Sequence, residues 1–166
     1  MLYHTHLAGG MTTATLLYMF VQRAYPELTF TNTTLYFGAI SCLVGSVAPD
    51  IDLPTSKAAK SIGPASKVLS FFFGHRTFFH SPLIVVLLYF ALNYFFPQYS
   101  IYTIAFLAGY CSHLFLDMFN KTGIPLLYPR KKRYHIASIK TGSRGETVIS
   151  IALFFVSTIS IIHQIT

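Results

Sequence analysis

Charged residues are scarce in this sequence, and acidic ones most of all. Of its 166 residues, 12 are Lys or Arg and 5 are Asp or Glu, so 10% are charged whereas 53% are hydrophobic. An ordinary soluble domain has about 25% charged residues. The composition therefore excludes that class and is typical of a membrane protein.

Cysteines are nearly absent as well. Cys42 and Cys111 both fall inside apolar runs, so we interpret them as apolar packing residues and not as a disulfide. No Lys or Arg precedes Leu7, although a secretory signal peptide begins with positive charge. We therefore expect the first apolar run to remain in the mature protein. Without an internal repeat or a low-complexity tract, residues 1–166 are expected to form a single domain.

The sequence contains five apolar runs, each near the length that crosses a hydrocarbon core of roughly 30 Å. They are Leu7 to Val21, Leu35 to Val47, Leu83 to Phe96, Ile101 to Phe119 and Val148 to Ile162. We predict an all-α fold, a polytopic membrane helical bundle of about five transmembrane helices. Because the second and third runs are short and would also suit buried or partly inserted helices, a count of four remains open.

The basic residues fall mainly in two segments, between the second and third runs and from Lys121 to Arg144. The positive-inside rule places both segments in the cytoplasm. The N-terminus is then cytoplasmic, the C-terminus lies on the other side, and the inner membrane is the expected location. The run PRKKRY (129–134) would also suit nucleic acid. Beside a membrane helix we interpret it as a topology signal and a contact for anionic lipids, with no nucleic-acid partner.

Histidine and aspartate residues gather on this same predicted side, although they played no part in assigning it. His4 and His6 precede the first predicted helix, Asp50 and Asp52 follow the second, His75 and His80 precede the third, and His113 and Asp117 occupy the last turns of the fourth. An Asp inside a membrane costs about 2.5–3.5 kcal/mol on insertion scales. A bound cation would offset that cost.

Local patterns suggest how these side chains converge. Pro49 and Pro54 flank VAPDIDLP, so we expect Asp50 and Asp52 on extended backbone, where alternate side chains point the same way. In HLFLD, His113 and the aspartate four residues later share one helix face, which suits two ligands of one ion or a ligand with its orienting partner.

The stretch GHRTFFHSP (74–82) marks a helix start. Ser81 is a candidate N-cap, and Pro82 is a candidate first helical residue. His75 and His80 are five residues apart, so they converge only if the segment is a loop, which Gly74 would permit. In THLAGG, Gly9 and Gly10 predict a close helix approach beside His6.

Several of these residues have simpler interpretations. A lone membrane histidine is often a hydrogen-bonded core residue, and Arg76 would serve equally as a topology charge. We interpret His4, His135 and His163 as incidental. Glu146 forms SRGE with Ser143, a capping box ahead of the last apolar run. As a set, imidazole and carboxylate ligands without thiolates suit zinc, or a dinuclear manganese or iron site.

The motifs THLAGG, PDID, GHRTFFHS, HLFLD and NKTGIPLLYP, in this order from about His6 to Pro129, resemble the YdjM family of bacterial and archaeal membrane proteins, which are described as metal-dependent hydrolases. The resemblance implies a small integral membrane hydrolase. It also implies a metal-ligand set made of His6, Asp50, Asp52, His75, His80, His113 and Asp117. The mixed His and Asp set is faintly similar to zinc-dependent phospholipase C and P1-type nucleases.

The predicted function is that of a metal-dependent hydrolase. A divalent ion, zinc first and manganese or iron as alternatives, would lower the pKa of bound water, with Asp50 or Asp52 as the base. Arg76 would stabilise an oxyanion, and Ser81 would hydrogen-bond it or only cap the helix. A site at headgroup depth favours a phosphoester of a lipid or an amphiphile as the substrate.

Other classes remain open. The same cluster would suit a metal-ion or proton transporter, for which a homodimer would supply a second half, or a scaffold with a structural metal. The paired H-x-x-H-H clusters of a di-iron oxygenase and the H-E-x-x-H of a metalloprotease are both absent from the sequence. The segment Thr55 to Ser70 would cover the site, touch lipid headgroups or serve only as a connector.

Overall fold

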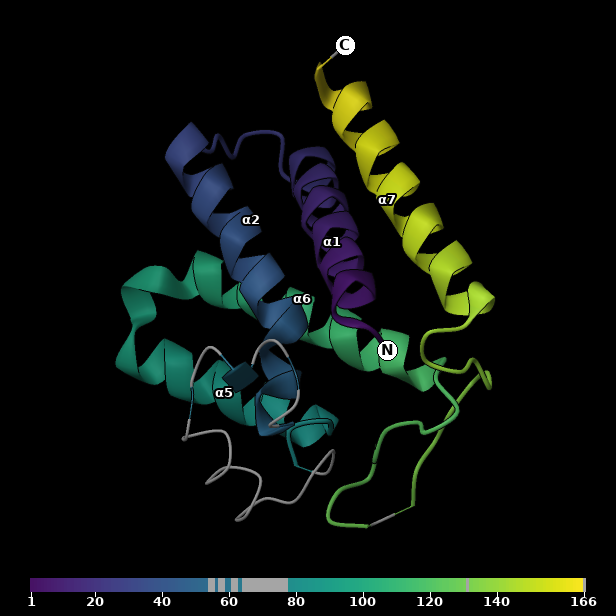
Figure 1. Ribbon diagram of the computed structural model, residues 1–166. Helices are drawn as coiled ribbons and strands as arrows, with labels where there is room; N and C mark the ends of the chain where they lie inside the picture. The colour runs from purple at the N-terminus through teal and green to yellow at the C-terminus, as the bar shows by residue number, and fades with distance from the viewer. Residues whose placement is uncertain (54–55, 57–58, 61–62, 64–77, 131, 166) are drawn as a thin grey trace.

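The computed structural model describes residues 1–53, 56, 59–60, 63, 78–130 and 132–165. These residues form an all-helical structure (Figure 1). The elements are α1 (Tyr3–Ala24), α2 (Asn32–Val47), η1 (Ala48–Asp52), α5 (Pro82–Phe95), η2 (Pro97–Tyr99), α6 (Ser100–Met118) and α7 (Arg144–Ile165), where η marks a 3₁₀ helix. The described residues contain isolated β-bridges but no strand. The predicted all-α fold is confirmed.

The five α-helices given above for the described residues match the five predicted apolar runs, but they do not all have the length and composition of a membrane span. Within the described part of the chain, three helical stretches do: Asn32–Asp52, Pro97–Met118 and Arg144–His163. The 14-residue α5 is apolar but shorter. The 22 residues of α1 provide the length, but its histidines and threonines reduce its apolar character. A helical membrane bundle follows, with three clear candidate spans.

Helix α6 is the centre of the packing. It contacts α1, α2 and α5, whereas α7 packs against α1. In Figure 1, α1, α2 and α7 run upright beside one another, and α6 crosses behind the lower parts of α1 and α2. The N-terminus lies at the lower end of α1 and the C-terminus at the upper end of α7 (Figure 1).

Glycines allow the helices to approach closely. A Cβ atom on Gly45 would collide with the carbonyl oxygen of Phe106, and one on Gly109 would collide with the carbonyl oxygen of Cys42. Helices α2 and α6 therefore touch backbone to backbone, as small residues permit in membrane helices. The approach predicted at THLAGG is also present, because a Cβ on Gly9 would lie 2.5 Å from Leu116 Cδ1.

Two helix starts differ in detail from the prediction. Helix α1 begins at Tyr3, so His4 and His6 lie on the helix and do not precede it. Helix α5 does begin at Pro82 after Ser81, but the Ser81 hydroxyl donates to the carbonyl of Phe78 (2.8 Å) and makes no cap bond. The serine therefore tightens the turn before the helix instead of capping it.

The two cysteines are free. Cys42 is buried, and its thiol donates to the carbonyl of Gly10 over 3.4 Å, which agrees with a packing role. Cys111 is exposed on α6, so its interpretation as a packed residue was wrong.

The segment after α6 folds back along the end of that helix. Ile136 N–H donates to the carbonyl of Met118 (2.7 Å), and Ile139 N–H donates to the carbonyl of Phe119 (3.0 Å). The chain therefore returns past the end of α6 before α7 begins at Arg144. This return brings the first turn of α7 beside the first turn of α1.

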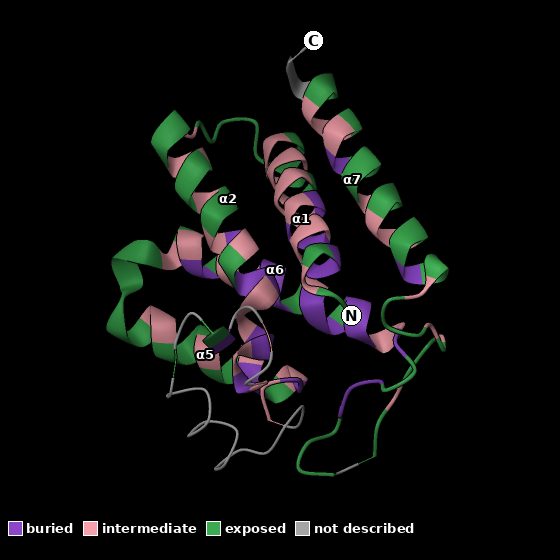
Figure 2. Ribbon diagram, viewed as in Figure 1, coloured by how far each residue is buried: buried purple, intermediate pink, exposed green. Residues whose placement is uncertain are grey.

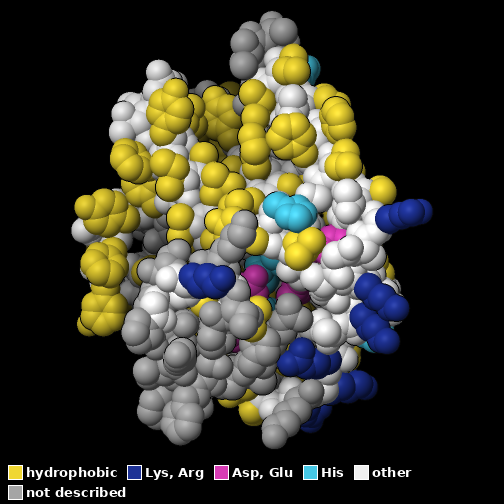
Figure 3. All heavy atoms as spheres, in the orientation of Figure 1, with side chains coloured by type: hydrophobic (Ala, Val, Ile, Leu, Met, Phe, Trp, Pro, Cys, Tyr) yellow, Lys and Arg dark blue, Asp and Glu magenta, His cyan; other side chains and the backbone are white. Residues whose placement is uncertain are grey.

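Burial and charge are unevenly distributed. Buried residues concentrate where α1, α2 and α6 meet, whereas most of α7 is exposed (Figure 2). On the face shown in Figure 3, hydrophobic side chains cover the upper part, and Lys and Arg lie in the lower part. The exposed apolar surface includes Phe20, Phe90, Phe155 and Ile159, a pattern suited to lipid contact.

Candidate metal centre

Six of the seven predicted metal ligands gather in one buried cluster. They come from four segments: His6 from α1, Asp50 and Asp52 from η1, His80 from the turn before α5, and His113 and Asp117 from α6. Asp50 is the most accessible, at 7% exposure, and the other five are at 0–1%. His75, the seventh, lies outside the described residues. Carboxylates and imidazoles this deeply buried need a compensating partner.

Four atoms of this cluster, which we call the inner quartet, alternate between nitrogen and oxygen. His80 Nε2 lies 3.6 Å from both Asp50 Oδ1 and Asp117 Oδ2. His113 Nε2 lies 3.8 Å from Asp50 Oδ1 and 3.7 Å from Asp117 Oδ2. Two ligands of a tetrahedral zinc ion, each about 2.0–2.1 Å from the metal, stand roughly 3.4 Å apart. The four nitrogen–oxygen distances of the inner quartet are close to that value.

These separations are too long for hydrogen bonds, which join nitrogen and oxygen at about 2.7–3.2 Å. The Nε2 atoms of His80 and His113 and Oδ1 of Asp50 are buried and make no hydrogen bond with any residue the structure describes. Leaving such atoms unpaired costs roughly 1–3 kcal/mol each. Coordination of a cation would satisfy all three atoms together.

A carbonyl or carboxylate oxygen lies behind each histidine of the quartet, but only the one behind His113 is within hydrogen-bond distance. His113 Nδ1 lies 2.8 Å from the carbonyl oxygen of Ser46, which can only accept, so this nitrogen carries the proton and Nε2 is left with its lone pair. His80 Nδ1 faces Asp52 Oδ2 at 3.8 Å. A carbonyl or carboxylate behind a metal-binding imidazole is the usual arrangement, because it fixes the ring and its tautomer.

His6 extends the cluster on the α1 side. Its ring stacks on that of His113, with centroids 3.6 Å apart and planes 12° from parallel. His6 Nε2 lies 3.5 Å from Asp117 Oδ1, and the α-amino nitrogen of Met1 approaches the same oxygen at 2.7 Å. The two oxygens of Asp117 therefore face different ways, one toward the quartet and one toward His6.

We predicted extended backbone for Asp50 and Asp52, but the structure places both residues on the 3₁₀ helix η1. Proline is tolerated in the first turn of a helix, so Pro49 permits this helix to follow α2 directly. Pro54 comes just after it ends. The two side chains still reach a common partner, His80.

Tyr110 and Ser46 make hydrogen bonds that position the site, but neither residue was identified from the sequence. The Tyr110 hydroxyl donates to the carbonyl of Phe79 (2.6 Å) and so anchors the turn that carries His80 to α6. A signal existed for Tyr110, because it lies one helical turn before His113 and shares its face. None existed for Ser46, whose backbone carbonyl makes the contact.

Of the three predicted catalytic residues, Asp50, Ser81 and Arg76, the first two lie in or beside the cluster. Asp50 belongs to the inner quartet. Ser81 is fully buried beside His80, and its hydroxyl donates a hydrogen bond to the carbonyl of Phe78. Arg76 lies outside the described residues, as does most of the segment Thr55 to Ser70.

Glu146 does not form the predicted capping box. It is fully buried, and Oε1 accepts from the backbone N–H of Leu2 and from the Thr5 hydroxyl, the latter over 3.2 Å. Its Oε2 accepts from Gly142 N–H (2.6 Å). The carboxylate accepts hydrogen bonds from the start of α1 and not from its own helix, because the first N–H groups of a helix have no partner within that helix.

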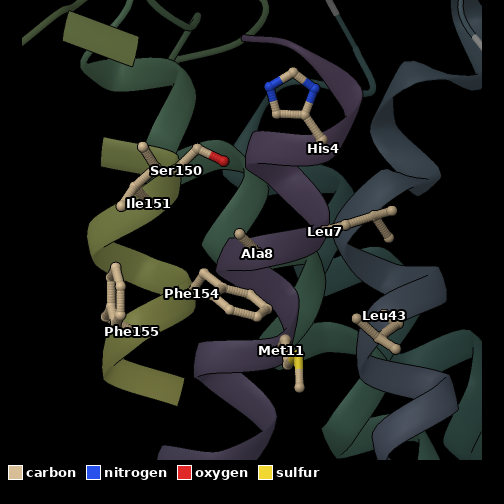
Figure 4. Close-up of a pocket in the computed structure, with 9 residues that line it drawn as sticks. All are labelled: His4, Leu7, Ala8, Met11, Leu43, Ser150, Ile151, Phe154 and Phe155. Carbon is tan, nitrogen blue, oxygen red and sulfur yellow. The ribbon is translucent and has the colours of Figure 1, made fainter. Parts of the chain in front are cut away.

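The remaining histidines lie apart from the cluster. His135 and His163 are exposed. His4 lines an apolar groove of about 730 Å³ between α1, α2 and α7, together with Leu7, Ala8, Met11, Leu43, Ser150, Ile151, Phe154 and Phe155 (Figure 4). His4 and Ser150 belong to the first two turns of α1 and α7, but the surface that lines the groove is almost entirely apolar.

Comparison with known proteins agrees with this architecture. The family described as YdjM inner membrane protein matches residues 1–165. A Bacillus subtilis (strain 168) protein named "Uncharacterized protein YvsG" is 33% identical over 160 residues, which cover 92% of this chain and 89% of that protein. "Inner membrane protein YdjM" of Escherichia coli (strain K12) is 34% identical over 122 residues, or 69% of this chain and 61% of that protein. No solved structure matches.

Proposed function

The chain belongs to the YdjM family of inner membrane proteins, and we propose that it is a membrane-bound, metal-dependent hydrolase of a phosphoester. The observation that carries the proposal is the inner quartet, two imidazole nitrogens that each lie 3.6–3.8 Å from two carboxylate oxygens in a buried site. Nitrogen and oxygen ligands in this number suit zinc, and manganese or iron are the alternatives.

The ion would supply water made acidic enough to give hydroxide near neutral pH. The chain's own residues divide the remaining work. Asp50, the most accessible carboxylate of the cluster, takes the proton from the water through its second oxygen. Asp52 and the carbonyl of Ser46 hold His80 and His113 in their orientations. Arg76 remains our candidate for binding a phosphoryl oxygen.

A lipid or other amphiphilic phosphoester is the proposed substrate class. The apolar groove between α1 and α7, lined by Met11, Phe154 and Phe155 among others, suits the hydrocarbon part of an amphiphile. The basic segments favour a site at the cytoplasmic surface. An anionic headgroup would meet positive charge there.

Transport of a metal ion is the second candidate. It is favoured by the burial of the cluster, since His6, His113 and Asp52 have no exposed surface. Buried ionisable groups between membrane helices are also how ion pathways are built. The two candidates differ in their outcome, because only the hydrolase releases a product from an ester.

The test compares detergent-purified wild-type protein with the variant His113→Ala. Elemental analysis should find about one or two equivalents of a divalent metal in the wild type and a loss of at least 10-fold in the variant. The metal-loaded wild type should release phosphate or headgroup from mixed phospholipid vesicles, and the variant should not. Metal uptake into proteoliposomes without ester hydrolysis would replace the hydrolase with the transporter. A wild type that binds no metal would overturn both.

A further inference from the structure

We infer that Glu146 is a positioning residue that holds His6 in the metal centre. The inference rests on the proposed metal site and adds a role for α7. Among the described residues, two groups could hold an ion, His6 with His113 and Asp117 and Asp50 with His80 and His113, and neither includes a residue of α7.

Glu146 joins α7 to the first turn of α1. Its Oε1 accepts from Leu2 N–H and the Thr5 hydroxyl, across more than 140 residues of sequence, while Oε2 accepts from Gly142 N–H. The carboxylate is fully buried. No side chain of its own segment caps α1 at Leu2, so Glu146 supplies the acceptor that a helix start requires.

This connection lies directly beside the cluster. Thr5, which Glu146 binds, is followed by His6, whose ring stacks on His113 and whose Nε2 faces Asp117. The contacts of His6 with these two residues are a stack and a 3.5 Å separation, and neither nitrogen of its ring makes a hydrogen bond with a residue the structure describes. Its position therefore depends on the placement of the α1 backbone, which Glu146 fixes.

A second bond between the same helices provides a matched control. The Thr12 hydroxyl donates to the carbonyl of Leu153 on α7 (2.8 Å). Thr12 lies six residues beyond His6, about 9 Å along the helix axis. A variant at Thr12 loosens the contact of α1 with α7 without touching the first turn of α1.

The first test uses metal-free protein, so it does not depend on the proposed function. Histidines are modified with diethylpyrocarbonate and quantified by peptide mass spectrometry in the wild type, Glu146→Gln and Thr12→Val. We expect His6 to react at least 5-fold faster in Glu146→Gln and at the wild-type rate in Thr12→Val, with His113 and His80 still protected. Equal protection of His6 in all three proteins would overturn the inference, as would uniform exposure of every histidine.

The second test is a double-mutant cycle on zinc affinity with Glu146→Gln, His6→Ala and the double variant. If Glu146 acts through His6, each single variant weakens affinity by a similar factor, on the order of 10-fold, and the double variant is no weaker. Additive losses would show that Glu146 acts by another route. Should Glu146→Gln fail to fold, Thr5→Val removes one of the same bonds and takes its place. A wild type without zinc affinity would refute the proposed function and leave the modification result standing.

Discussion

The imidazole ring of His6 lies flat against that of His113, with centroids 3.6 Å apart and planes 12° from parallel. The two histidines nevertheless differ in their relation to the inner quartet, because His113 contributes Nε2 to it and His6 faces only the outer oxygen of Asp117. We predict that His113→Ala abolishes metal binding, whereas His6→Ala still binds the metal, with an affinity reduced about 10-fold. Competition with a zinc-binding dye measures both.

The control for this pair is His135→Ala, because His135 is exposed in the loop before α7 and should leave metal affinity unchanged. Equal loss of metal from His6→Ala and His113→Ala would contradict the division of the cluster into an inner quartet and an outer histidine.

Substitution of Asp52 tests whether a residue outside the inner quartet contributes to metal affinity by orienting His80. It faces Nδ1 of His80 at 3.8 Å and is not part of the inner quartet. Asp52→Asn should therefore lower metal affinity by about 10–100-fold, the range typical of groups that orient a ligand. Asp50→Asn should reduce it further, because it replaces a ligand atom. Isothermal titration with zinc gives both values, and an Asp52→Asn protein weaker than Asp50→Asn would reverse the two roles.

The sequence predicted the composition of the cluster better than its backbone. The grouping of His and Asp residues at helix ends carried enough information to bring His6, Asp50, His80 and Asp117 together, since buried ionisable groups in a membrane protein need one another. The five α-helices named in the described part of the chain followed from the apolar runs. These signals are local and compositional.

Features set by tertiary contact were predicted wrongly or not at all. Pro49 and Pro54 favoured extended backbone, yet η1 forms because proline fits the first turn of a helix. The SRGE motif favoured a cap, yet Glu146 bonds Leu2 and Thr5 on another helix. No local pattern shows which distant N–H group will need an acceptor.

Metal removal should destabilise the protein, because His80 Nε2, His113 Nε2 and Asp50 Oδ1 would then be buried without a hydrogen-bond partner among the described residues. For a ligand that binds only the folded state, saturation at 100 times Kd adds about 2.7 kcal/mol of stability. We expect a chelator such as EDTA to lower the Tm of the wild type in detergent and to have no effect on His113→Ala. An equal shift in both proteins would place the metal effect outside this site.

The crossing of α2 and α6 gives a prediction about stability. A Cβ on Gly109 would meet the carbonyl group of Cys42, backbone that cannot move aside as a side chain can. Gly109→Ala should therefore force the helices apart, at a cost of about 1–3 kcal/mol or more, and should also weaken metal binding, because His113 follows on α6 and Asp50 follows α2. Gly38→Ala is the matched control: it lies on α2 with nothing within 4 Å of the added atom, and alanine is the better helix former by about 1 kcal/mol. Thermal unfolding in detergent should show a lower Tm for the first variant and an unchanged or higher Tm for the second, and two variants of equal stability would rule out the backbone contact.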